Sequence, residues 1–138
     1  MMTLGGPDGR FDLEVVTPVS ADRTQWCRIR VTVDYVQDWW SASDTCLMVE
    51  EVEQLANWLE TAATETPVPN LLTFVEPELS FQLRDGEPRL LRICLRYGLR
   101  RPTHSDRAEP SCFDYPAEPG QSHRAAEALR GQLERGSH

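Results

Sequence analysis

The chain of 138 residues contains no lysine, since all 14 of its basic residues are arginine. This absence excludes mechanisms that need a lysine amine, such as a Schiff base or a P-loop lysine. No apolar run approaches the ~18 residues that a membrane helix needs. Residues 1–10 have neither the basic region nor the apolar stretch of a signal peptide. We therefore expect a cytoplasmic protein with no membrane partner.

The sequence also lacks the cysteine spacing of a metal or redox site. Its four cysteines, Cys27, Cys46, Cys94 and Cys112, form no C-x-x-C pair, which argues against a zinc ribbon or a redox dithiol. In a cytosolic chain such scattered cysteines behave as small buried hydrophobic side chains. The histidines lie in the last third, away from any cysteine pair. We expect no cofactor and no metal site.

Motifs for covalent or phosphate chemistry are missing as well. The serines have no G-x-S-x-G context and the glycines form no phosphate loop. His104 can be drawn as a general base, but a solvated loop histidine is the favoured interpretation. Glu76 and Glu78 can be drawn as an acid pair, although pairing with Arg92 and Arg96 across a sheet is favoured. We predict that the protein is not an enzyme, and a small hydrolase is the least favoured alternative.

The distribution of charge is uneven along the chain. Acidic residues outnumber basic ones by 22 to 14, and the formal net charge is −8. The segment 31–83 contains ten acidic residues and no arginine, lysine or histidine. A field of this sign repels nucleic acid, whose binding requires cations that neutralise phosphates, and it speeds the encounter with basic molecules. We expect a basic protein partner and no nucleic acid.

Acidic and aromatic side chains gather within this cation-free segment. Tryptophan is enriched at interface hot spots, and acidic residues at the rim of an interface steer a basic partner. The alternative is that one of the two adjacent tryptophans belongs to the core while the acidic residues only keep the domain soluble. The candidate partner-binding residues are Asp38, Trp39, Trp40, Asp44, Glu50, Glu51 and Glu53.

A second hypothesis uses the arginines of the later part of the chain. They would form the anion site of a small-molecule binding module whose ligand is unknown. Arg92 and Arg96 are better interpreted as cross-strand partners of acidic residues. The candidate anion-binding residues are Arg92, Arg96, Arg100 and Arg101.

Periodicity predicts several strands and two helices. Met48, Val52, Leu55, Leu59 and Ala62 fall on one helix face, and a final helix begins near 118–119. Alternating apolar residues predict strands at 11–15, 26–35, 79–83 and 91–97, and an apolar run of strand length predicts one at 71–75. Two further short strands are expected at 39–47 and 112–115. We predict an α+β fold with a single antiparallel sheet of about six to seven strands and two helices packed mainly on one face. The whole chain, 1–138, would be one domain, with 1–9 and 136–138 disordered.

The segments around Asp85-Gly86 predict a β-hairpin. An odd-length loop pairs Phe81 with Leu91 and leaves one face of the hairpin wholly apolar. An even-length loop would turn Arg92 onto that face, because a slip of one residue turns every side chain over. We therefore predict the odd-length loop.

Three segments carry a pattern of their own: Cys46-Leu47, the helix Glu50-Glu51-Val52-Glu53-Gln54-Leu55-Ala56-Asn57-Trp58-Leu59 and the segment Phe74-Val75-Glu76-Pro77-Glu78-Leu79-Ser80-Phe81. In this order they resemble the WapI-family immunity proteins. The most specific pattern is Phe-x-Glu-Pro-x-Leu-Ser-Phe, in the third segment. The order of the remainder is similar too, with a strand ending near Arg101-Pro102, a short strand at Phe113-Asp114-Tyr115 and a closing helix. The resemblance spans residues 11–134.

The resemblance implies a function. WapI-family immunity proteins are small bacterial proteins made beside secreted or contact-delivered polymorphic toxins. A protein similar to them would neutralise a cognate toxin by binding it, without catalysis. The implied partner is the C-terminal domain of the toxin, and a nuclease is one class of toxin that an acidic surface would suit. We expect a monomer or a weak homodimer.

Overall fold

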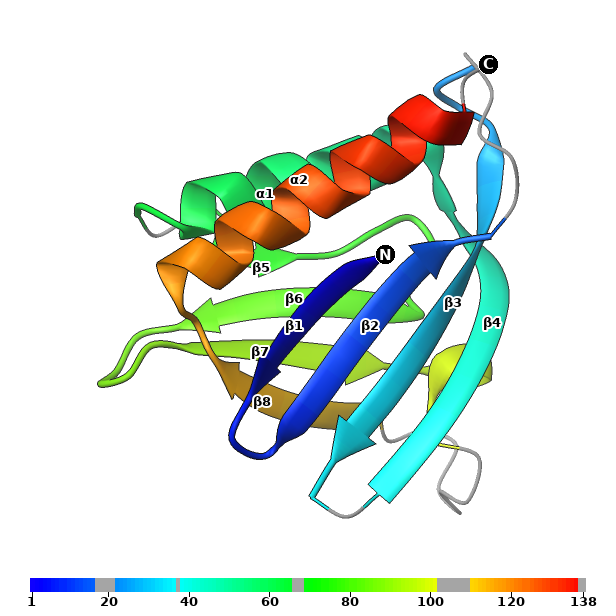
Figure 1. The fold of residues 1–138 in the computed structure, drawn as a ribbon. Coiled ribbons are helices and arrows are strands. Elements are labelled where there is room, and N and C mark those ends of the chain that lie inside the picture. Colours follow the sequence, from blue (N-terminus) through cyan, green and yellow to red (C-terminus); the bar gives the residue numbers. More distant parts are fainter. Residues whose placement is uncertain (17–21, 37, 66–68, 102–109, 137–138) are drawn as a thin grey trace.

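The structure is a computed structural model that describes residues 1–16, 22–36, 38–65, 69–101 and 110–136. Within these residues the strands form two four-stranded antiparallel sheets, with two α-helices at one end (Figure 1). The predicted α+β class with two helices is confirmed. The predicted single sheet is wrong, because the strands before and after the first helix do not pair with each other.

The first sheet has the strand order β1-β2-β3-β4 and is built from consecutive hairpins. Its strands are β1 (Met2–Gly6), β2 (Gly9–Val15), β3 (Trp26–Tyr35) and β4 (Asp38–Met48). β3 alternates exposed and buried residues along most of its length, as predicted. Because β4 has a strand on one side only, it is a long edge strand of the sheet.

The first residues of the chain form a buried strand. We predicted that residues 1–9 are disordered, and this was wrong for β1. Leu4 pairs with Phe11 of β2, and Met2 and Leu4 are at most 1% exposed. The segment is short and rich in glycine, so its order comes from β2 beside it and from the last helix, which packs against it. That helix continues through Gly136, and the predicted disorder of 137–138 lies outside the described residues.

The second sheet has the order β5-β6-β7-β8. Its strands are β5 (Leu71–Leu72), β6 (Leu79–Arg84), β7 (Leu90–Leu95) and β8 (Ser111–Pro116). In the central hairpin Arg84 pairs with Leu90 and Phe81 with Ile93. The odd-length loop is therefore confirmed and the apolar face is intact. The predicted pairing of Phe81 with Leu91 is wrong by two residues, because the loop includes all of 85–89.

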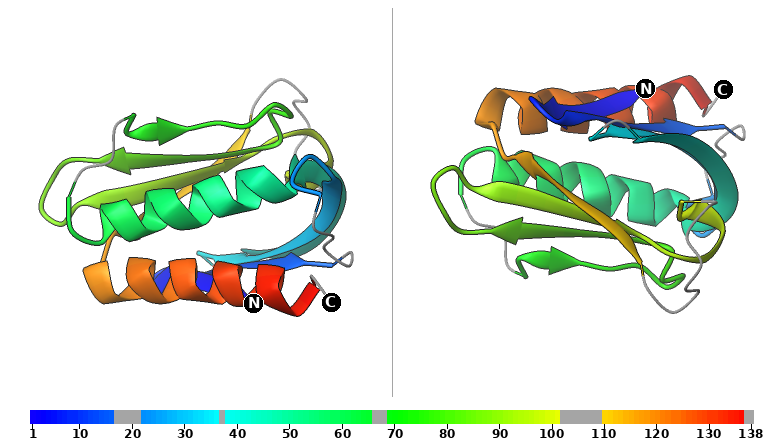
Figure 2. Two further views of the ribbon diagram at one scale, coloured as in Figure 1. Left: turned by 90° about the horizontal axis from the view of Figure 1, so that it is seen from above. Right: turned by 90° about the horizontal axis from the view of Figure 1, so that it is seen from below.

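The helices α1 (Val49–Ala62) and α2 (Pro119–Gly136) pack against each other, and α2 also packs against β1. Figure 2 shows α1 lying between the two sheets when the molecule is seen from above or below. The short 3₁₀ helix η1 (Tyr97–Leu99) follows β7 and packs against β4. We expected the helices to cover one face of a single sheet, and this arrangement is not found. No helix among the described residues combines the length and apolar character needed to cross a membrane.

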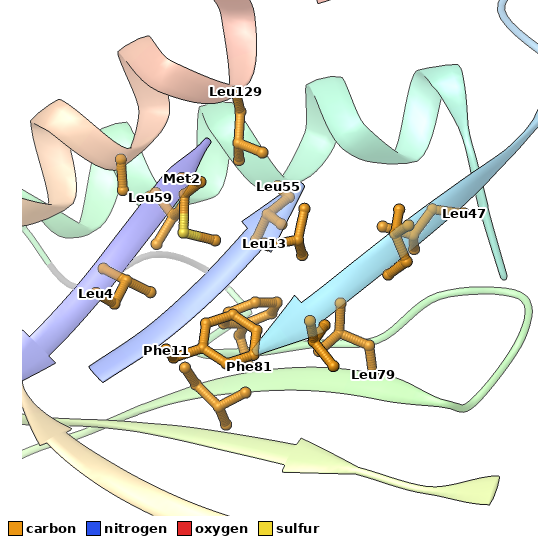
Figure 3. Close-up of a cluster of buried hydrophobic side chains, with 14 of the residues drawn as sticks. Met2, Leu4, Phe11, Leu13, Leu47, Leu55, Leu59, Leu79, Phe81 and Leu129 are labelled. Carbon is orange, nitrogen blue, oxygen red and sulfur yellow. The ribbon is translucent and has the colours of Figure 1, made fainter. Parts of the chain in front are cut away.

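The hydrophobic core lies between the two sheets and under the helices. Figure 3 shows Leu55 and Leu59 of α1 reaching toward the side chains of the first sheet. Phe11 and Phe81 meet across the two sheets, with ring centroids 6.3 Å apart in an edge-to-face arrangement. This arrangement is the one that aromatic quadrupoles favour. The core therefore joins the two sheets into one packed body.

The cysteines divide into two pairs of different character. Cys27 and Cys46 are free and buried, as predicted. Cys94 and Cys112 instead form a disulfide between β7 and β8, with Cα atoms 4.1 Å apart. The prediction of four buried thiols was wrong for this pair. The two residues are opposite each other in the sheet register, a proximity that their separation of 18 residues in the sequence does not reveal.

Candidate partner-binding surface

The two adjacent tryptophans of β4 point to opposite sides of the first sheet. Trp40 is 4% exposed, and its Nε1 donates a hydrogen bond to the carbonyl oxygen of Leu99 at 3.1 Å. The Trp40 ring also packs edge-on against Phe113. Trp39 is 65% exposed. Because side chains alternate along a strand, one indole belongs to the core and only Trp39 is available to a partner.

Glu51, which the sequence suggested as a partner-binding residue, is buried. It is 3% exposed. Its Oε1 accepts a hydrogen bond from the backbone N–H of Met48 at 3.0 Å, and its Oε2 accepts one from the N–H of Val75 at 2.9 Å. The carboxylate therefore caps the start of α1 and ties it to the segment before β6. We remove Glu51 and Trp40 from the candidate surface for this reason.

Arginines that are distant in the sequence neutralise part of the acidic segment. Asp38 forms an ion pair with Arg101, and Glu53 forms one with Arg23. Glu50 is half-buried at the first turn of α1, where its backbone N–H donates to the carbonyl oxygen of Arg23. Sequence reasoning treated segment 31–83 as free of cations. The tertiary structure brings two arginines to this segment, Arg23 from the sequence before it and Arg101 from the sequence after it.

A cluster of carboxyl groups lies where β4 approaches the start of β6. The Glu78 side chain is hydrogen-bonded to Asp44. Burial, this hydrogen bond and the nearby charges of Asp44 and Glu76 raise the pKa of Glu78 to about 8. Burial raises the pKa of the Cys46 thiol as well, and the nearby acidic groups Glu78, Asp44, Glu51 and Glu76 add to this effect. The raised pKa of Glu78 means that the pair with Asp44 keeps one shared proton at neutral pH.

Two of the four arginines of the alternative anion site already have partners within this chain. Arg92 forms a bidentate ion pair with Asp114, with N–O distances of 2.9 and 3.1 Å, rather than the expected pair with Glu76. Arg101 lies over the Trp40 ring in addition to its ion pair. Arg96 and Arg100 are half-buried. Arg92 and Arg101 are thus already paired with carboxylates of this chain.

A small cavity lies beside Arg101. It has a volume of about 190 Å³ and is lined by Tyr35, Trp40, Arg101, Pro110, Ser111, Cys112 and Phe113. Cavities that bind small molecules usually measure ~300–1,000 Å³. The cavity is thus smaller than the usual size for a metabolite-binding module. The catalytic candidate His104 lies outside the described residues.

Sequence reasoning missed several exposed apolar residues beside the acidic groups. Val36, Val75 and Tyr97 are 62%, 70% and 62% exposed. Val36 and Tyr97 also have φ angles of 47° and 55°, a region that costs a non-glycine residue free energy and is found more often at functional sites. No local pattern marks these side chains as exposed.

We name these residues together the edge surface, because they lie along or beside the edge strand β4. Trp39 projects from one face of the first sheet, whereas Asp38 and Asp44 project from the face that Trp40 occupies. One end is the β3–β4 turn, and the other is the carboxyl cluster next to η1. Asp44 lies against η1 so closely that a Cβ on Gly98 would be 2.6 Å from its Oδ2. At ~3.3 Å per residue of strand, the two ends are about 17 Å apart along β4. The edge surface consists of Asp34, Val36, Asp38, Trp39, Asp44, Val75, Glu76, Glu78 and Tyr97.

Comparison with known families identifies the group of proteins to which the sequence is related. The model of the family described as "Immunity protein WapI-like family" matches residues 2–135. The chain belongs to this family. The match confirms the resemblance found in the sequence and also includes β1, which that resemblance left out. Comparisons with curated proteins and with solved structures found no match.

Proposed function

We propose that this WapI-like protein is an immunity protein that neutralises its cognate toxin by binding to the toxin domain, without catalysis. The edge surface is the proposed contact. The observation that carries the proposal is the exposure of Trp39, which is 65% accessible on the long edge strand β4. A large exposed indole with acidic residues beside it is typical of a protein interface rather than of an isolated surface.

Trp39 has the surroundings of an interface hot spot. It pairs with Asp34 across the β3–β4 hairpin, and Asp38 precedes it. Exposed Val36 lies in the same turn. A partner that covered this turn would bury the indole and the valine, while the Asp34 carboxylate remained at the rim and Asp38 stayed paired with Arg101. Rim carboxylates raise the rate of association with a basic partner, and the buried indole would slow dissociation.

The carboxyl cluster at the other end supports a basic partner. Asp44 and Glu78 share a proton because burial, the hydrogen bond between them and the closeness of their charges all disfavour a second ionised carboxylate. A cation of the toxin placed beside Glu76 would remove part of that repulsion and favour ionised Glu78. A standard interface covers about 800 Å² on each partner, and a partner that wrapped around the edge strand β4 would reach Trp39 on one face of the sheet and the carboxyl cluster on the other. A basic nuclease domain would suit this arrangement.

Five of the seven residues that the sequence suggested as partner contacts remain in the proposal, three in the edge surface and two at its margin. Asp38, Trp39 and Asp44 belong to the edge surface. Glu50 and Glu53 lie at the start of α1, where Glu53 is paired with Arg23. They remain predicted contacts at the margin of the interface.

The test uses the toxin domain encoded beside this gene. Co-expression with the wild-type chain should rescue growth of cells that make the toxin, and the purified proteins should form a complex measurable by calorimetry. Trp39→Ala should weaken binding about 30-fold, the loss expected for a hot-spot residue. Trp26→Ala is the matched control, because Trp26 is 39% exposed at the opposite end of the hairpin.

The outcomes separate the function from the surface. Absence of both rescue and binding with the wild-type chain would contradict the immunity function. Rescue and binding that Trp39→Ala leaves unchanged would contradict the edge surface alone.

A further inference from the structure

Three potential metal ligands meet where the end of α1 contacts the beginning of α2. His123 and Glu127 are one turn apart on α2 and so share a face, and Glu60 reaches them from the last turn of α1. His123 Nδ1 lies 2.9 and 3.0 Å from the two carboxylate oxygens of Glu60. One donor atom from each of the three side chains lies within 4.8 Å of the other two.

The donor types match those of a transition-metal site. One imidazole nitrogen and two carboxylate oxygens are common ligands of zinc and of neighbouring divalent metals. Two ligands of tetrahedral zinc, each at about 2.0–2.1 Å, lie about 3.3 Å apart. The observed separation between His123 and Glu60 is already close to that value. The exposed position leaves room for water or a further ligand to complete the coordination.

Arg130 shows that this position attracts positive charge. Its Nη1 lies 3.8 Å from Glu60 Oε2 and 3.6 Å from Glu127 Oε1. Both distances exceed those of good hydrogen bonds, which are 2.7–3.2 Å. The Nη2 of the same guanidinium donates to Asn57 Oδ1 at 3.1 Å. Arg130 therefore balances the two carboxylates loosely and keeps a second partner to which it can turn.

We propose that Glu60, His123 and Glu127 form a binding site for one divalent transition-metal ion, with zinc as the best match to the ligands. The ion would link the two helices at the seam between them, with water in the remaining position. Arg130 would compete with the ion for the two carboxylates. This site lies on the helices, and the proposal does not depend on the edge surface or on toxin binding.

The test is titration of the intact chain with Co²⁺, followed by its displacement with Zn²⁺. The wild-type chain should bind one equivalent of Co²⁺ and develop the d–d absorption bands of a low-coordinate site. His123→Ala should weaken binding at least tenfold, because a ligand is lost. Arg130→Gln should tighten binding severalfold, because a competing cation is removed. His104→Ala is the control variant and should bind as the wild type does.

Two results would overturn the proposal. One is the absence of a Co²⁺ spectrum at millimolar metal with the wild-type chain. The other is equal metal affinity in the wild type and in H123A, which would place any bound ion elsewhere. His123 and Glu127 are exposed, with side-chain exposures of 54% and 60%. Their replacement should leave the circular dichroism spectrum unchanged.

Discussion

The carboxyl group of Glu78 is hydrogen-bonded to the carboxylate of Asp44, which joins the start of β6 to the edge strand β4. This contact connects the two sheets on the side where η1 packs. It depends on one proton that the two groups share. The stability of the fold and the charge of the edge surface are therefore both linked to pH through this pair.

The shared proton predicts that stability declines as the pH rises. The pKa of Glu78 is about 8 in the folded chain, against an ordinary value of 4.5. Between these pH values the folded state keeps a proton that the unfolded state has lost, so its stabilisation decreases as pH rises through this window. Glu78→Gln keeps a hydrogen-bond donor and removes the titration. Melting temperatures measured from pH 5 to pH 9 should therefore decline less in this variant.

The control for this prediction is Glu76→Gln, which changes an exposed neighbouring carboxylate. It should reduce the repulsion but keep most of the pH dependence. If E78Q followed the wild-type pH profile, the shared proton would not be the cause of the decline.

The two adjacent tryptophans should differ greatly in their contribution to stability. Trp40→Ala removes a buried indole that packs against Phe113, and it should lower the free energy of unfolding by about 3–5 kcal/mol. Trp39→Ala should change it by less than about 0.5 kcal/mol, because that side chain is largely exposed. Urea denaturation of the two variants measures the difference. If Trp40→Ala does not fold, Trp40→Phe should still be less stable than Trp39→Phe.

Glu51 should be important for stability although it is charged. Glu51→Ala leaves the N–H groups of Met48 and Val75 without their acceptors, and it should cost about 1–3 kcal/mol. Glu50→Ala is the matched control one residue earlier on the same helix turn, with an expected change within about 0.5 kcal/mol. Equal losses in the two variants, measured by chemical denaturation, would contradict the capping role.

The cysteines should separate by their reactivity. In the native chain without reductant, an alkylating reagent should modify none of the four, since two are buried and two are joined. After mild reduction Cys112 should react first, because it is exposed. Replacing Cys94 and Cys112 together with serine should cost about 2–4 kcal/mol, the usual contribution of a disulfide. Mass spectrometry counts the labels, and denaturation of the double variant measures the loss.

The sequence predicted those features that depend on local periodicity. The strands β2 and β3, the helix α1, the apolar face of the Phe81 hairpin and the α+β class all follow from which side chains recur at intervals of two or about 3.6 residues. The family resemblance likewise rested on a short local pattern, Phe-x-Glu-Pro-x-Leu-Ser-Phe. For the candidate site, the sequence located the acidic and aromatic segment that includes Trp39. It left open which of the two tryptophans is exposed.

Only the tertiary structure decided how these elements meet. It ordered β1 through β2 and α2, divided the strands into two sheets, placed Cys94 opposite Cys112, and brought Arg101 to Asp38 and Arg23 to Glu53. It also turned Glu51 inward and gathered Asp44 with Glu78. The physical reason is that periodicity specifies the buried face of each element, whereas partners distant in sequence are selected by the packing of all those faces together. The charge available to a partner depends on that packing as much as on composition.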